Sequence, residues 1–447
     1  MNRTRLTAAI VETLEDRKLL HAPAIDAIPN YTMPAGKHLY VPVTSSYDHS
    51  DPVAYTVIDD SSELQATVRT TRSSWIEMQV AGYSEPMVFQ LFDDLAPKTV
   101  ATMKGLVQAG YFDGQLFHRV INNFVLQGGD PKTLQPSSSD NVWGTGGPGF
   151  EFDDEFHPAT VFSGDGQLAM ANSGKDTNGS QFFITEGPQR GLDFNHAIWG
   201  QLVRGKATRN AISNTSVDSN SRPTSEIRIT RMRVIANTKD TVLAIKANGI
   251  ASGTVTVFAN GAEGNDSQTF NVNSIADVTN DPPILSVPQS VYYTPVNTPI
   301  AIRLRGADLE GNPIDMRGAF IDSSGVEAGT IKDNVVRITP KAGFTGTITL
   351  YVGAGVVGAQ SRGTSSFNES QPLGGIYDTQ KITIAVGEKM ISGTGTKFVY
   401  TSGAPANNIV VANFYDADRR GRASNFQAKI NWGDGAITTG TIVQNAD

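Results

Sequence analysis

Residues 117–130 read FHRVINNFVLQGGD, a segment that combines one arginine with apolar and amide side chains. Three related strings follow it: LAMAN at 168–172, NGSQFFI at 178–184 and LDFNHAIWG at 192–200. None of them has a Ser-His-Asp order, a recognised pair of carboxylates or a phosphate loop. One arginine between apolar walls suits a neutral, partly apolar group that is held by one strong hydrogen-bond donor.

The composition bounds the classes of function that fit this chain. Its 447 residues are 39% hydrophobic and 18% charged, and the length suggests roughly three domains. The net charge of −8 argues against nucleic acid or anionic lipid as the main partner. The absence of cysteine excludes disulfides, thiolate zinc sites and thiol nucleophiles. No apolar run reaches the roughly 18 residues that a membrane span requires, so no transmembrane span is predicted.

The central part of the chain mixes strands with two short helices. Pro97 fits the first turn of a helix, where its missing N–H costs nothing. Val100, Met103 and Val107 then line one helical face. A second helix is predicted near residues 207–213.

The four strings, in this order and spacing, resemble a cyclophilin-type peptidyl-prolyl cis–trans isomerase over residues 74–235. The resemblance implies a mainly β fold, namely a closed eight-stranded antiparallel barrel with two capping helices. It also implies that the substrate is an X-Pro bond in a proline-containing segment of a client protein. Rotation about that bond is slow because amide resonance opposes it. No cofactor and no metal are implied.

The resemblance also assigns the site residues. Arg119 is the central catalytic residue, because its guanidinium would bind the prolyl nitrogen as resonance is lost, an interaction that is strongest in the twisted state. Phe124 and Gln127 complete the catalytic set. The proline ring would be gripped by Phe124, Val125, Phe183, Leu192 and His196, while the backbone of Asn172, with Ala171 and Gln181 beside it, would hold the residue next to proline.

Each of these residues also has a structural interpretation. Taken singly, a phenylalanine such as Phe124 is usually core, Arg119 a surface cation and His196 a structural histidine. Their conjunction at the family's spacing favours a site. The adjacent His118 is predicted to be structural. Gly191 stands where the family often has an aromatic residue, which predicts altered affinity for cyclosporin-type macrocycles and unchanged isomerase chemistry.

The segments that flank the barrel alternate polar and apolar residues in short runs, which is typical of β-sandwiches. Residues 23–73 resemble the first half of a cadherin-like or immunoglobulin-like repeat, and the β segment 236–280 resembles the second half through 278. Our hypothesis is that the barrel is inserted into one sandwich, because each half is too short to bury a core alone. Independent small units are the alternative. Residues 281–388 resemble a second cadherin-like sandwich.

Two further segments bear on context. Residues 1–22 contain LEDRKLL at 14–20, which resembles an N-terminal motif of planctomycete surface proteins. Residues 389–447 resemble a PKD-like repeat whose closing strands are missing, so a truncated repeat is predicted. We therefore expect an extracellular or cell-surface protein with surface partners bound through its β repeats. A non-catalytic proline-peptide binder, an adhesive scaffold and a general chaperone remain the alternatives.

In the second sandwich, Asp308 and Glu310 lie in a DxDG-like turn. Calcium prefers 6–8 oxygen ligands, so two carboxylates favour a plain turn over a calcium site.

Overall fold

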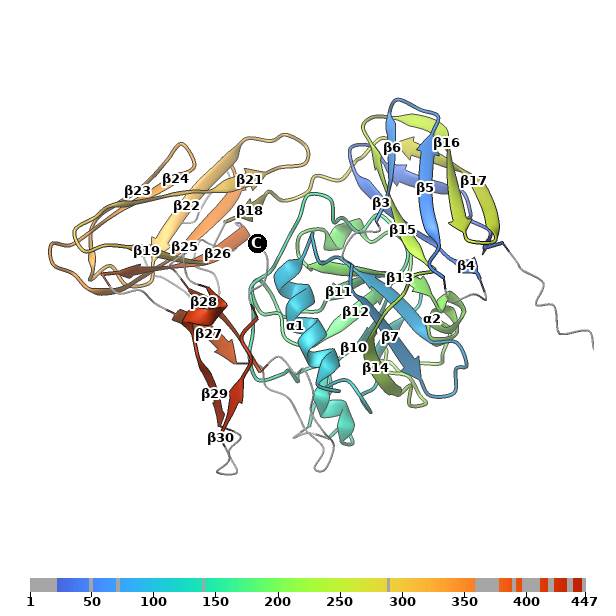
Figure 1. Cartoon of the computed structure of the whole chain (residues 1–447), viewed down its shortest axis with the longest axis horizontal. Helices are drawn as coiled ribbons and strands as arrows, with labels where there is room; N and C mark the ends of the chain where they lie inside the picture. Colours follow the sequence, from blue (N-terminus) through green and yellow to red (C-terminus); the bar gives the residue numbers. More distant parts are fainter. Residues whose placement is uncertain are drawn as a thin grey trace, which may run out of the picture.

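The computed structural model describes residues 22–47, 51–69, 73–138, 141–287, 290–357, 378–387, 391–395, 411–416, 422–431 and 437–443. The described part is mainly β and contains an eight-stranded barrel-like sheet flanked by sandwich-like pairs of sheets (Figure 1). None of its helices is both long enough and apolar enough to cross a membrane.

Eight antiparallel strands curl into the central sheet in the order β14-β7-β8-β13-β11-β12-β10-β9. Their bounds are β7 (Trp75–Val80), β8 (Met87–Leu91), β9 (Arg119–Ile121), β10 (Val125–Gly128), β11 (Gln167–Met170), β12 (Phe182–Thr185), β13 (Ile198–Arg204) and β14 (Ile229–Ile235). The two outer strands do not pair as strands, which differs from the expected closed ladder. Because β9 is only three residues long, the seam is closed just before it, by an isolated bridge between Leu116 and Arg228.

Two α-helices among the described residues pack beside this sheet: α1 (Pro97–Gln108) and α2 (Lys206–Ser213). Proline stands in the first turn of α1, as the sequence predicts, and Val100, Met103 and Val107 are buried. Their side chains join the aliphatic and aromatic core inside the sheet. Two 3-10 turns, η1 (Pro131–Leu134) and η2 (Arg190–Leu192), lie in the connecting loops.

Strands from both sides of the barrel form one sandwich-like pair of sheets. One sheet has the order β3-β15-β6 and the other β2-β17-β16-β5. The hypothesis of an inserted barrel requires pairing between residues 36–58 and 241–272, and β3 pairs with β15 and β5 with β16. The bounds are β1 (Ala24–Ile25), β2 (Tyr31–Pro34), β3 (His38–Val43), β4 (Ser45–Ser46), β5 (Ala54–Asp59), β6 (Leu64–Val68), β15 (Thr241–Ala247), β16 (Ala251–Gly261) and β17 (Gly264–Ile275).

One apolar core lies between these two sheets and draws on both chain segments. It contains Leu39, Val41 and Leu64 from before the barrel and Ile245 and Phe270 from after it. We call this unit the first sandwich.

The second sandwich is built from residues that follow the linker at 276–283. Its sheets have the orders β19-β26-β25-β22 and β20-β24-β23, and its core contains Ile302, Val336, Leu350 and Ile384. The bounds are β18 (Ile284–Ser286), β19 (Val291–Thr294), β20 (Ile300–Arg303), β21 (Arg305–Ala307), β22 (Ile314–Phe320), β23 (Val326–Lys332), β24 (Val335–Pro340), β25 (Gly346–Val356) and β26 (Asp378–Val386).

The C-terminal segment contains two short antiparallel pairs among its described residues. They are β27 (Ile391–Gly395) with β28 (Ala412–Asp416) and β29 (Ala428–Asn431) with β30 (Ile437–Gly440). The LEDRKLL motif at 14–20 and the Trp432–Gly435 turn of the PKD-like prediction lie outside the described residues.

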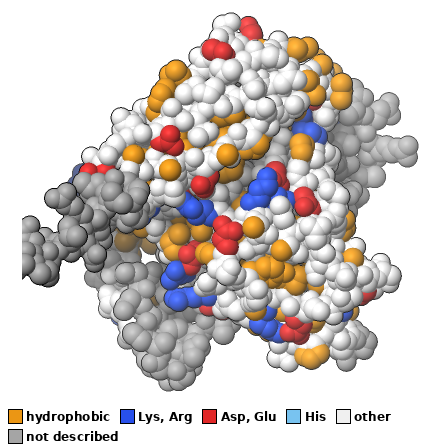
Figure 2. Space-filling view, turned by 90° about the vertical axis from the view of Figure 1, so that its right-hand side faces the viewer, with side chains coloured by type: hydrophobic (Ala, Val, Ile, Leu, Met, Phe, Trp, Pro, Cys, Tyr) orange, Lys and Arg blue, Asp and Glu red, His pale blue; other side chains and the backbone are white. Residues whose placement is uncertain are grey.

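Both sandwiches contact the barrel. Tyr40 and Val242 of the first sandwich pack against Trp75 and Phe92 of the barrel. Ile284 of the second sandwich packs against Val161 and Phe194 of the barrel. The face in Figure 2 carries side chains of both signs close together across its middle.

Candidate active site

Three amide and guanidinium side chains form a hydrogen-bonded chain across β9, β10 and β12. Arg119 and Gln127 are register partners on adjacent strands, so their side chains lie on the same face of the sheet. Arg119 Nη1 donates to Gln127 Oε1 at 3.1 Å, and Gln127 Nε2 donates to Gln181 Oε1 at 3.0 Å. The Gln181 amide in turn donates to the carbonyls of Gly144 at 3.0 Å and Gly146 at 2.9 Å. The chain fixes the orientation of the guanidinium, because each amide has a single arrangement that satisfies both neighbours.

Apolar side chains lie on the same face of the sheet as this guanidinium, because Phe183 and Arg119 are both register partners of Gln127; we call this apolar surface the pocket. Val125 and Phe183 are buried members of one cluster, and Phe124, Ala171 and Leu192 are partly buried against it. The ring of Phe183 stacks on Phe162 with centroids 5.7 Å apart. The pocket therefore presents a largely aromatic surface.

His196 closes one side of the pocket. Its ring meets Phe183 edge-on at a centroid distance of 5.2 Å. Its Nδ1 lies 3.0 Å from the carbonyl oxygen of Met170, which can only accept, so Nδ1 carries the proton. Burial lowers the pKa of His196, with the Met170 contact opposing the shift. The imidazole is thus neutral at neutral pH and forms an uncharged wall.

A groove with a cavity volume of about 480 Å³ shares Ala171 with this pocket and is also lined by Gln127, Asn172, Gln181 and the glycine-rich stretch 144–149. Ala171 N donates to the carbonyl of Gln181 at 2.9 Å, which joins the two walls. The Asn172 amide is turned away from the groove and donates to the carbonyl of Asn195 at 2.9 Å. This side-chain bond, on the side away from the groove, therefore fixes the position of Asn172.

All ten residues assigned from the sequence gather at this pocket and groove. His118 is 6% exposed and burial lowers its pKa, which agrees with a structural role. Sequence reasoning missed Phe162, the supporting aspartate Asp154 and the rim residue Arg190. It also assigned no role to the glycine-rich stretch 144–149, which supplies the carbonyls that accept from Gln181.

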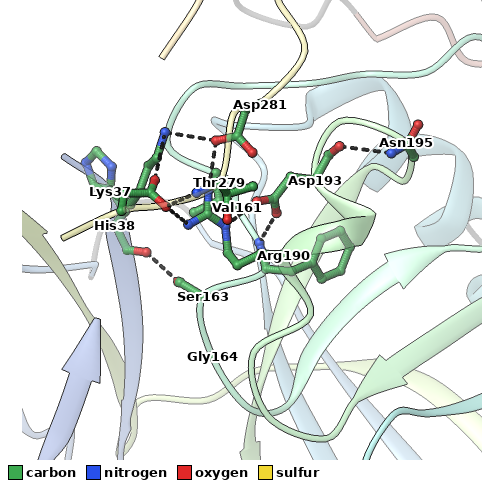
Figure 3. Close-up of polar contacts among 12 residues, drawn as sticks. Lys37, His38, Val161, Ser163, Gly164, Arg190, Asp193, Asn195, Thr279 and Asp281 are labelled. Carbon is green, nitrogen blue, oxygen red and sulfur yellow. Dashed lines mark hydrogen bonds and ion pairs between the residues drawn. The ribbon is translucent and has the colours of Figure 1, made fainter. Parts of the chain in front are cut away.

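A buried ionic network holds the rim of the pocket. The turn η2 carries Leu192, and Arg190 at its start bonds the Asp193 carboxylate and donates to Asp277 at 3.1 Å and Asp281 at 2.8 Å (Figure 3). Burial raises the pKa of Asp193 to about 7, although the bond to Arg190 opposes the shift. Lys37 of the first sandwich reaches the same linker carboxylate, with its Nζ 2.8 Å from Asp281.

The carboxylates of Asp277, Asp281 and Glu310 have oxygens within 4.8 Å of one another, a spacing that could suit a metal ion. The Lys37 ammonium, which is 2% exposed, forms ion pairs with all three. Burial lowers the pKa of Lys37, but its bonds to Asp281 and Glu310 outweigh burial and the pKa is raised. The positive charge among these carboxylates is therefore that of the Lys37 ammonium. Asp308 Oδ1 instead accepts from the backbone of Glu310 and Asn312, at 3.1 and 2.8 Å, as a plain turn would.

Comparison with known proteins identifies the central unit. The model of the cyclophilin type peptidyl-prolyl cis-trans isomerase/CLD family matches residues 75–234. The chain is 43% identical over 156 residues to peptidyl-prolyl cis-trans isomerase A of Mycobacterium tuberculosis, covering 31% of this chain and 81% of the relative. It is 40% identical over 143 residues to peptidyl-prolyl cis-trans isomerase-like 1 of Homo sapiens, covering 32% and 82%.

A crystal structure of a cyclophilin type isomerase from Cryptosporidium parvum is similar at 32% identity and a TM-score of 0.34, covering 37% of this chain and 99% of that one. The sequence prediction of an isomerase of this class is confirmed by the family model and the curated relatives. The chain belongs to the family of cyclophilin-type peptidyl-prolyl cis–trans isomerases.

Proposed function

We propose that the barrel isomerises X-Pro bonds in exposed, flexible segments of client proteins, with Arg119 as the hydrogen-bond donor to the prolyl nitrogen. The observation that carries this proposal is the placement of Arg119, whose guanidinium is oriented by Gln127 at 3.1 Å beside an apolar pocket. The assignment of individual residues to roles is part of the proposal.

The catalytic effect follows from the electronic structure of the amide. A planar X-Pro bond delocalises the nitrogen lone pair, and the barrier to rotation is about 18–20 kcal/mol for peptide bonds generally. Twisting localises the lone pair on nitrogen, which then accepts a hydrogen bond that neither planar form can accept well. A donor held at that position stabilises the twisted state more than the ground state, which lowers the barrier.

The pocket supplies the other half of the mechanism. Phe124, Val125, Phe183 and Leu192 grip the proline ring while the chain on the other side of the bond turns. The neutral ring of His196 adds an apolar edge without an opposing charge near the arginine. The backbone of Asn172 holds the residue before proline, and no covalent intermediate or proton transfer is required.

The test is the cis-to-trans rate of a short X-Pro peptide with the wild-type chain, Arg119→Ala and Arg233→Ala. Arg233 is a matched control, because it is an exposed arginine of β14 that pairs with Glu77. Loss of a transition-state donor typically lowers a rate about 10²–10³-fold. We expect that loss for Arg119→Ala alone. A wild-type chain that folds and does not accelerate the reaction would instead establish a peptide-binding module.

We also propose that the protein acts at the cell surface or outside the cell, where its cadherin-like and PKD-like segments bind surface partners. The support is the LEDRKLL motif at 14–20 and the two β-sandwiches that accompany the barrel. Antibody labelling of intact cells, compared with permeabilised cells, tests the location. Labelling that requires permeabilisation contradicts it.

A further inference from the structure

The loop of residues 172–178 separates the substrate groove from the second sandwich. On its inner side, Asn172, Ser173 and Thr177 line the groove. On its outer side, Asp176 accepts a hydrogen bond from Thr379 of β26. The same loop is therefore a wall of the substrate site and a docking surface for another domain, which lies beside the barrel in Figure 1.

A continuous chain of hydrogen bonds crosses this wall. Thr379 Oγ1 donates to Asp176 Oδ2 at 2.9 Å. Asp176 and Asp154 bond reciprocally, each backbone N–H donating to the other carboxylate at 2.9 Å. Asp154 Oδ1 then accepts from the Asn172 amide at 3.3 Å and from Asn178 Nδ2 at 2.8 Å. Thr379 is thus linked through two aspartates to Asn172, which lines the groove.

Asp154 and Thr379 are the buried members of this chain of bonds, so water does not readily replace them. Asp154 and Thr379 are each 3% exposed. Gln380, the next residue of β26, donates from Nε2 to the carbonyl of Asp154 at 3.1 Å. Asp176 has a φ of 58°, in the left-handed region that non-glycine residues adopt at a cost. Such a conformation persists where its surroundings hold it, and here the bonds from Asp154 and Thr379 do so.

Several carboxyl groups lie close together at this junction, and the second sandwich offers them uncharged hydrogen-bond donors. Burial, reinforced by Asp153 and Asp154, raises the pKa of Asp176 to about 7. Burial also raises the pKa of Asp153, Asp154 and Asp378. Lys175 is the cation among them, with Lys98 and Lys381 acting on Asp153. Hydroxyl and amide donors such as Thr379 and Gln380 satisfy these crowded carboxylates without a further ion pair.

From this geometry we infer that Thr379 is a positioning residue for the subsite that holds the residue preceding proline. It acts through Asp176 and Asp154 on Asn172, so β26 of the second sandwich completes the substrate site of the barrel. The inference rests on the proposed function and deepens it. It predicts that the second sandwich tunes substrate recognition and leaves the chemistry at Arg119 unchanged.

The test uses the full chain with Thr379→Val, Thr379→Ser and Thr383→Val. Valine matches the shape of threonine and removes only the donor, whereas serine keeps the hydroxyl. Thr383 is the matched control, because it lies in the same strand and, among the described residues, makes no side-chain hydrogen bond to the barrel. Isomerisation is measured over a series of X-Pro peptides that differ only in the residue X.

We expect Thr379→Val to raise KM about three- to tenfold, the effect of one lost hydrogen bond, with kcat unchanged. The preference among X residues should flatten, because the subsite for X is the one affected. Thr379→Ser should restore both properties, and Thr383→Val should match the wild type. A merely structural role would lower the folded fraction without changing the X preference.

Two outcomes overturn separate claims. If the wild-type chain shows no isomerisation of any peptide, the proposed function fails and the subsite has no role in catalysis. If the wild type is active but Thr379→Val retains its KM and its X preference, the inference fails and the proposed function stands. An equal loss with Thr379→Ser also overturns the inference, because the hydroxyl would then not be the operative group.

Discussion

The orientation of Arg119 depends on two glutamines rather than on a carboxylate. Gln127 accepts from the guanidinium and donates to Gln181, which is tied to backbone carbonyls of the glycine-rich loop. A carboxylate at position 127 would pair with Arg119 and weaken its ability to donate elsewhere. The amide therefore holds the guanidinium in place and leaves its charge available to the substrate.

Gly191 lies in the turn η2, next to Leu192, and it allows a direct prediction. Gly191 is exposed and has open space where a Cβ would stand, so a side chain can be added there without a clash at its first atom. Gly191→Trp should retain isomerase activity and bind cyclosporin-type macrocycles at least tenfold more tightly, because an indole buries a large apolar area at the rim. Inhibition curves with such a macrocycle measure the change. An unchanged inhibition constant would show that Gly191 is not what sets affinity.

How much of the site the sequence could predict depends on the distance between partners. Arg119, Phe124 and Gln127 lie within one string. The hairpin of β9 and β10 makes Arg119 and Gln127 register partners, and Phe124 lies in its turn. Asn172 also appears in a motif, but its supporting partners Asp154 and Asn195 lie 18 and 23 residues from it in sequence, and Asp154 lies outside every matched string. A side chain that only orients another residue through a hydrogen bond has no local sequence pattern of its own.

The turn η2 is the element through which the linker and the first sandwich reach the proline pocket. It carries Leu192, and its Arg190 shares the carboxylates of Asp277 and Asp281 with Lys37. Sequence reasoning named Leu192 as a site residue and had no signal for the network, because the members of the network come from four separate segments. Ion pairs between distant segments follow from the tertiary arrangement alone.

Lys37→Met tests the strength of this network. The lysine is 2% exposed, and its removal leaves several buried carboxylates with Arg190 as their remaining cation. Breaking a buried ion pair by removing one partner typically costs about 3–5 kcal/mol. We expect the first unfolding transition in urea to move to clearly lower denaturant. Lys246→Met is the matched control, because Lys246 is the register partner of His38 and lies outside the network. Equal midpoints for the two variants would show that solvent compensates for the lost ammonium.

At the scale of the whole molecule, the barrel leaves and re-enters the first sandwich at adjacent strands. Val68 of β6 is the register partner of Leu243 of β15, and Arg69 N donates to the carbonyl of Val242 at 2.9 Å. The sequence predicted this arrangement as a hypothesis, from the shortness of the two halves. It could not predict the docking of the second sandwich on the barrel, because the contacts of Thr379 and Gln380 involve no recurring pattern.

The adjacency of these strands predicts that the first sandwich folds without the barrel. Replacing residues 70–241 with Asn-Gly would join β6 and β15 in a hairpin, because that dipeptide favours the two-residue turn whose twist matches antiparallel strands. The core between the two sheets would remain complete. Tyr40 and Val242 would lose their contacts with the barrel, at a cost of about 1.5–3 kcal/mol for each exposed side chain.

We therefore expect this shortened chain, residues 22–69 joined to 242–278, to give a β-type circular dichroism spectrum and a cooperative thermal transition below that of the full protein. Residues 22–69 alone are the control and should be unfolded, because they lack the strands that complete both sheets. A joined chain that is as unfolded as the control would contradict the prediction. That result would mean that the two segments form the first sandwich only when the barrel brings them together, because their shared core is not stable enough alone.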